Sequence, residues 1–182
     1  MTPEQARDLR GEVEAASKQA QALFAGLDAV ALTKRPAEGG WSVAEIVQHL
    51  ILTADAMLPL VEAAVSEAER TGQKAAGSTG LGFIGWLLVK SLEPPARLKT
   101  KTIKPFEPVS VTDPLNLVDR FVASNAMLIH VIDRATGLAT NRVKVVSPFN
   151  AKVKYNVYAA FRIMLAHGRR HLSQAEQAKA GT

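Results

Sequence analysis

Apolar residues recur at intervals of three and four over much of the chain, the spacing that places them on one face of an α-helix. The first such segment follows Thr2-Pro3-Glu4-Gln5, in which a threonine cap, a first-turn proline and a glutamine three residues after the cap mark a helix start. A long amphipathic helix is therefore predicted, with apolar positions at Leu9, Val13, Ala16, Ala20, Leu23 and Leu27.

A second helix is predicted from the segment WSVAEIVQHL, where Ser42 and Glu45 form the Ser-x-x-Glu pattern of a capping box. We expect it to end near Arg70 and to be kinked at Pro59, because proline removes one helix hydrogen bond. Its apolar positions are Ile46, Leu50, Met57, Val61 and Val65.

Two more helices are predicted in the second half of the chain. One begins at the Asp113-Pro114 pair and ends near residue 136, and the other extends from about residue 155 to residue 178. The predicted buried face of the first is Leu115, Val118, Val122, Ile129 and Ile132. Between the two, residues 141–154 alternate apolar and basic side chains, which indicates a short extended segment, with a hairpin around SPFN as one form.

The segment 71–112 differs from the rest because it holds five glycines and four prolines. A short helix near 82–92 fits its pattern, and a connection of this length is often a lid or a crossover. We predict an all-α fold with residues 1–182 as a single domain. Its architecture is a four-helix bundle with one long crossover, a lid-like insertion, between helices 2 and 3.

Composition narrows the class of protein. Hydrophobic residues make up 47% and charged residues 21% of the 182, as in soluble globular proteins. The chain has no cysteine, so disulfides, thiolate metal sites and cysteine nucleophiles are excluded. The longest uncharged apolar run, LGFIGWLLV, is shorter than the roughly 20 residues of a membrane span. A soluble, cytoplasmic protein without a membrane partner is expected.

The net charge of +5 would permit contact with nucleic acid. The densest basic stretch, from Arg97 to Lys104, has no aromatic residue before Phe106, whereas nucleic-acid readers usually combine the two. We expect no nucleic-acid partner.

His167 and His171 lie four residues apart in MLAHGRRHLSQ and therefore share one helix face. That face is mostly small and apolar, so two imidazoles there can converge on one cation. Two histidines that only satisfy hydrogen bonds within the helix packing are the alternative.

A third ligand would come from His49 or His130, and depth along the bundle separates them. If the second and fourth helices are antiparallel, His49 lies roughly 10 Å into its helix, level with His171. If the third helix is parallel to the second, as a long crossover allows, His130 lies about 25 Å deep, more than a turn past His167, and off the apolar stripe. His130 is therefore predicted to be a surface or packing residue.

Three blocks of the sequence together resemble the DinB-like superfamily. They are Trp41-Ser42-x-x-Glu45-x-x-x-His49-Leu50, then Pro148-Phe149, and finally His167-x-x-Arg170-His171-x-x-Gln174. The resemblance implies a four-helix bundle, frequently dimeric, with a divalent metal such as zinc or nickel held by His49, His167 and His171. It also implies, from characterised relatives, thiol-dependent transferases and isomerases that use bacillithiol, mycothiol or glutathione. Residues 71–112 match nothing in that pattern, and substrate specificity is expected to lie there.

Three further side chains are candidate site residues. Glu45 is a general base or simply the capping-box carboxylate, and Gln174 orients His171 or is an ordinary buried amide. Arg170 binds an anionic substrate group or, with Arg169, lies on a solvated face.

The predicted function is a metal-dependent transferase that joins a small thiol to a small electrophilic substrate. A hydrolase that uses metal-bound hydroxide is the enzymatic alternative, and a non-catalytic metal- or ligand-binding stress protein is the alternative from another class. The sequence leaves open the metal, the substrate, the thiol and whether the protein forms a homodimer.

Overall fold

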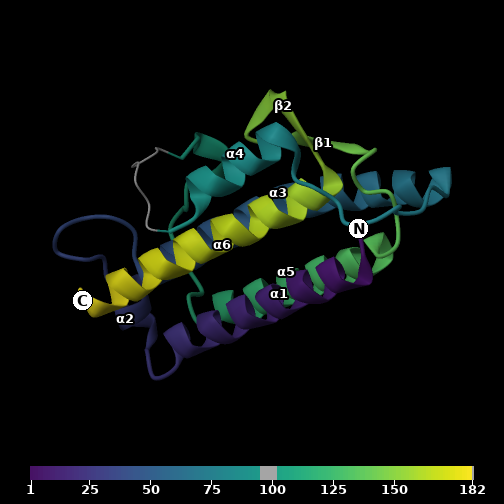
Figure 1. Ribbon diagram of the computed structural model, residues 1–182. Helices are drawn as coiled ribbons and strands as arrows, with labels where there is room; N and C mark the ends of the chain where they lie inside the picture. The colour runs from purple at the N-terminus through teal and green to yellow at the C-terminus, as the bar shows by residue number, and fades with distance from the viewer. Residues whose placement is uncertain (95–101, 182) are drawn as a thin grey trace.

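The computed structural model describes residues 1–94 and 102–181, and it is mostly helical with one small two-stranded sheet (Figure 1). The long helices are α1 (Pro3–Phe24), α3 (Val43–Thr71), α5 (Leu117–Ala135) and α6 (Val157–Ala180). Shorter elements are α2 (Ala29–Thr33), α4 (Gly82–Leu92), the 3₁₀ turn η1 (Lys104–Phe106), β1 (Lys144–Ser147) and β2 (Asn150–Asn156). Most of the basic stretch noted above, residues 97–101, lies outside the described residues.

The four long helices pack along one another around an apolar core. Helix α3 lies against both α5 and α6, and α1 contacts α5 and α6 from the other side (Figure 1). Phe161 of α6 is fully buried in the larger core cluster, together with Leu9, Val13, Val61 and Ile132. Helix α3 is long and apolar enough to cross a membrane, but half of that window is buried inside the fold, as in the core helix of a soluble domain.

Both capping boxes predicted from the sequence are present. Thr2 and Gln5 exchange side-chain and backbone hydrogen bonds at the start of α1. Ser42 and Glu45 do the same at the start of α3, which continues through Pro59 to Thr71. These starts are confirmed because a capping box is a local interaction that four consecutive residues make with one another.

The third long helix differs from its prediction. It begins at Leu117 rather than at Asp113-Pro114, where the Pro114 carbonyl instead accepts a turn hydrogen bond from Leu117. The predicted buried face is only partly correct. Ile132 is fully buried, and Val118 and Ile129 are partly buried against the core, whereas Leu115 is exposed. The buried residues are Leu117, Phe121, Leu128, Val131, Ile132 and Ala135. Two apolar stripes about 100° apart fit this segment, and packing between α1 and α3 selects one of them.

The extended segment before the last helix is an antiparallel hairpin, as predicted around SPFN. Strand β2 continues to Asn156, so α6 begins at Val157, two residues later than expected. The Asn156 side chain caps α6 by accepting from the Ala159 amide, and its own amide group donates to the Gly80 carbonyl. The predicted short helix at 82–92 is α4, which packs on α6 and β2.

Candidate metal centre

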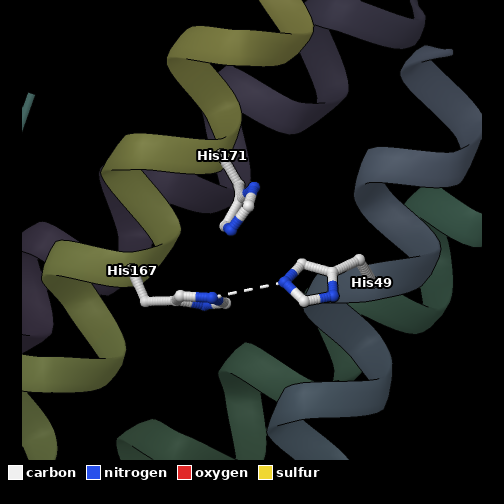
Figure 2. A group of neighbouring side chains, drawn as sticks. All are labelled: His49, His167 and His171. Carbon is white, nitrogen blue, oxygen red and sulfur yellow. Dashed lines mark hydrogen bonds between the residues drawn. The ribbon is translucent and has the colours of Figure 1, made fainter. Parts of the chain in front are cut away.

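Three imidazoles from two helices meet inside the fold. Helix α3 supplies His49, and consecutive turns of α6 supply His167 and His171 (Figure 2). The Nε2 atoms of His49 and His167 are 3.3 Å apart, and one nitrogen from each of the three rings lies within 4.8 Å of the others. His130, by contrast, is exposed on α5 and outside this cluster.

The spacing of the nitrogens fits a common cation. Two imidazole nitrogens bound tetrahedrally to zinc at about 2.0–2.1 Å stand roughly 3.3–3.4 Å apart, which matches the separation of His49 from His167. The Nδ1 atom of His171 is buried and has no hydrogen-bond partner among the described residues. A buried polar atom without a partner is rare in folded proteins. The metal assignment itself depends on the convergence of one nitrogen from each of the three rings. Three neutral nitrogen donors suit zinc, nickel or copper rather than magnesium or calcium.

A backbone carbonyl from the crossover fixes one of the rings. The Nδ1 atom of His49 lies 2.7 Å from the carbonyl oxygen of Phe106 in η1. With the proton on Nδ1 donated to this oxygen, the lone pair of Nε2 faces the other two imidazoles, an arrangement typical of metal-binding histidines. Sequence reasoning missed Phe106 in this role, because a backbone carbonyl leaves no signature in the residue type.

Aromatic side chains lie next to the cluster. The Trp41 ring lies 5.0 Å from His49 and 6.3 Å from His171, centroid to centroid. Phe149 of the hairpin turn lies 6.3 Å from His167 and 4.6 Å from Phe106, centroid to centroid. Trp41 is only partly buried and lies beside the imidazoles.

This environment keeps the imidazoles neutral. Desolvation lowers the pKa of His49, although the Phe106 carbonyl opposes the shift. Desolvation, reinforced by the nearby His49 and Arg170, lowers the pKa of His171 to about 3, with Gln174 acting against it. Desolvation and the two neighbouring rings hold the pKa of His167 well below its ordinary value. All three are therefore in the unprotonated form that binds a metal at neutral pH.

We expect the metal-free protein to lose stability on acidification below about pH 6.5. Unfolded histidines take up protons near that pH, whereas the lowered pKa of His171 keeps its folded form neutral down to about pH 3. The free energy of unfolding then falls by up to about 1.4 kcal/mol per pH unit for each such histidine. Urea denaturation with a chelator present, at about pH 7 and about pH 5, measures this loss. The variant His171→Asn should show a shallower dependence, and equal slopes would contradict the expectation.

A cleft of about 1910 Å³ opens onto the cluster. Its walls include Trp41, Met57, Leu88, Phe149 and Tyr155, so the loop before α3, helix α4 and the hairpin all contribute. His167 is only partly buried, whereas His49 is 2% and His171 9% exposed. A small molecule can therefore reach the cluster from the side of His167.

The Glu45 carboxylate is engaged at the helix start. It accepts from the backbone N–H of Ser42 at 2.8 Å and from the guanidinium of Arg35. Partial burial alone would raise the pKa of Glu45, but the hydrogen bonds from Arg35 and Ser42 lower it overall. The capping box is present, and the carboxylate is engaged by Ser42 and Arg35.

The two arginines between the histidines have different surroundings. Arg169 pairs with Glu12 and Glu93, which ties α6 to α1 and to the end of α4. Arg170 is 9% exposed, donates to the Ser91 carbonyl at 3.2 Å and lines the cleft, so it does not lie on a solvated face. Gln174 also lines the cleft, one turn after His171.

Comparison with known proteins adds one finding. The family model described as the DinB superfamily matches residues 12–175, a span that contains all three histidines of the cluster. No curated protein and no solved structure gives a significant match to the chain.

Proposed function

Because the chain belongs to the DinB superfamily, we propose that it is a divalent-metal-dependent enzyme whose metal ligands are His49, His167 and His171. Its proposed reaction joins a small thiol to a small electrophilic substrate. The observation that carries the proposal is the convergence of three neutral imidazoles beside an accessible cleft. Zinc or nickel suits this donor set.

A divalent cation bound there would act as a Lewis acid and lower the pKa of a thiol that reaches it. The chain supplies no sulfur nucleophile of its own, so the thiol must be a separate small molecule. In the proposed reaction the thiol loses its proton to water in the cleft. Its sulfur then bonds to the electrophilic carbon, and the leaving group departs with the bonding pair.

The side chains around the imidazoles position the reactants. The Phe106 carbonyl holds His49 in the required orientation. Trp41 and Phe149 place apolar rings next to the imidazoles, which would strengthen electrostatic interactions at the cluster. We assign Gln174 to the orientation of His171, whose protonation it influences.

Two further roles complete the proposal. We assign Arg170 to an anionic group of the substrate, since its guanidinium lies in the cleft wall and near the imidazoles. A catalytic role for Glu45 stays a prediction, because its carboxylate would first have to leave Arg35 and Ser42.

An assay of untagged protein tests the proposal directly. We expect about one zinc or nickel ion per chain by elemental analysis. Turnover of a small electrophile should require a thiol from a panel of glutathione, bacillithiol and mycothiol. Chelation should abolish turnover, and the metal should restore it. Turnover that survives complete metal removal would contradict the proposal.

Other results of the same assay identify the alternatives. Hydrolysis of esters or amides without added thiol would make the protein a metal-dependent hydrolase. Bound metal without turnover across broad thiol and substrate panels would make it a non-catalytic binding protein. Metal held by four protein ligands would favour this last outcome, because a catalytic site keeps a position open.

The proposal also includes the bundle architecture, the cellular location and the oligomeric state. The packing of α1, α3, α5 and α6 supports a four-helix bundle with residues 71–112 as its crossover. We propose a cytoplasmic location, consistent with the absence of cysteine from the sequence. Assembly as a homodimer stays a prediction that analytical ultracentrifugation would check.

A further inference from the structure

Helix α4 turns an apolar face to solvent. Phe83 is 74%, Ile84 42%, Trp86 47% and Leu87 49% exposed. These four residues and Lys90 share one arc of the helix, and we call them the α4 face. Contiguous exposed apolar surface of this kind marks a site of interaction.

The opposite side of α4 is fixed against the fold, so the α4 face cannot rotate inward. Gly85 lies so close to α6 that a Cβ atom there would come within 2.5 Å of the Ala159 Cβ. Gly85 and Val89 are buried, and Leu81 and Leu88 pack on the core from the same side. The exposure of the α4 face is therefore set by tight helix packing.

Basic side chains lie on α4 itself and on the neighbouring hairpin. Lys90 places its ammonium group 5.0 Å from the centre of the Trp86 ring. Strand β2 packs against α4, and its lysines at 152 and 154 are exposed while Tyr155 is buried. Lys144 on β1 is exposed as well. Figure 1 shows α4 and the hairpin together on one side of α6, with α1 and α5 on the other.

Carboxylates are absent from the same elements. The sequence contains no aspartate or glutamate in residues 71–92, which include α4, or in residues 134–175, which include the hairpin. Glu93, the first acidic residue after α4, is paired with Arg169. The charged side chains that α4 and the hairpin themselves carry are therefore all positive, and a partner that contacts both should be apolar and anionic.

We propose that the α4 face docks on the surface of an anionic phospholipid bilayer. Exposed Phe, Trp and Leu with flanking lysines are the features of helices that lie in the membrane interface. The apolar side chains would enter the headgroup region while Lys90, Lys152 and Lys154 contact lipid phosphates. With 11 residues, α4 is about 16 Å long and lies along the membrane rather than across it.

Other occupants fit the surface less well. A second copy in a two-fold contact would bring lysines against lysines without a carboxylate to pair with them. Nucleic acid would meet the charges, but Ile84 and Leu87 are aliphatic and offer no ring for base stacking. The expectation of no membrane partner rested on the lack of an apolar segment long enough to cross a bilayer. Binding to the membrane surface does not require such a segment.

Co-sedimentation of the full-length protein with vesicles tests the proposal. We expect binding to an equal mixture of phosphatidylglycerol and phosphatidylcholine, and little binding to phosphatidylcholine alone. The double variant Phe83→Ser/Trp86→Ser should bind at least roughly tenfold more weakly. Lys152→Glu/Lys154→Glu should do the same, since each lysine contributes roughly fivefold. Binding should also weaken from about 0.1 M to about 0.5 M NaCl.

Matched surface variants provide the controls. Val30→Ser removes an exposed apolar side chain from α2, and Lys18→Glu reverses an exposed charge on α1, so both should bind like the wild type. Chelation should leave vesicle binding unchanged, which separates this proposal from that of the metal enzyme. Absence of binding, equal binding to neutral vesicles, or unchanged binding by both double variants would overturn it. The proposal would also be overturned if the Phe83→Ser/Trp86→Ser variant still bound vesicles but lost the ability to form a dimer or a DNA complex that the wild type forms.

Discussion

Replacing His171 by alanine is expected to remove the divalent metal from the purified protein and to abolish turnover. The cluster contains three imidazoles, and His171 contributes a buried ring whose Nδ1 atom has no partner among the described residues. Changes outside the immediate ligands typically cost ten- to a hundredfold in metal affinity, so loss of a ligand should cost at least roughly a hundredfold. Elemental analysis and titration with a zinc-sensitive dye measure the effect.

The chain offers a matched control for this experiment. His130 is the one histidine that is exposed, and it lies on α5 away from the cluster. The variant His130→Ala should retain metal and activity at the level of the wild type. Denaturation curves of both variants would show that the His171→Ala protein is folded. Full metal occupancy in folded His171→Ala would refute the assignment of this histidine as a ligand.

Replacing Phe161 by alanine is expected to lower the free energy of unfolding by about 3–5 kcal/mol. Phe161 is fully buried on α6 in the larger core cluster, which also contains side chains from α1, α3 and α5. Its removal leaves a cavity that these rigid helices can fill only in part. The same helix carries His167 and His171, so we also expect weaker metal binding near the unfolding transition. Urea denaturation followed by circular dichroism measures the loss.

Phe83→Ala makes the same chemical change on the surface. Phe83 is 74% exposed, so its removal should alter stability by no more than about 0.5 kcal/mol. A comparable loss in both variants would show that the effect comes from helix propensity rather than from burial. A loss below about 1 kcal/mol in Phe161→Ala would mean that the core relaxes around the missing ring.

Local sequence patterns were sufficient for several features. The capping boxes at Thr2 and Ser42 identified two helix starts, because each involves only residues three apart. The spacing of His167 and His171 placed both on one helix face for the same reason. His49 could be matched to them by counting the rise along two antiparallel helices, and the three rings do lie together.

Other features depended on contacts between distant segments. The rotation of α5 was predicted only in part, because two apolar stripes fit its sequence and the packing against α1 and α3 selects between them. The role of the Phe106 carbonyl was missed, since any residue type presents a carbonyl and its position depends on the path of the crossover. Burial of Arg170 similarly follows from the position of α4 over α6.

The amino-acid sequence by itself determined where the two capped helices α1 and α3 begin, which face of α6 carries the paired imidazoles and which family the chain resembles. These properties depend on residues three or four positions apart, and the regular spacing of an α-helix determines where such residues lie relative to one another. The tertiary structure alone decided what surrounds the imidazoles, which arginine faces the cleft and which side of α4 remains in solvent. Each of these depends on how separate elements pack, and a periodic pattern specifies an apolar face without specifying its partner.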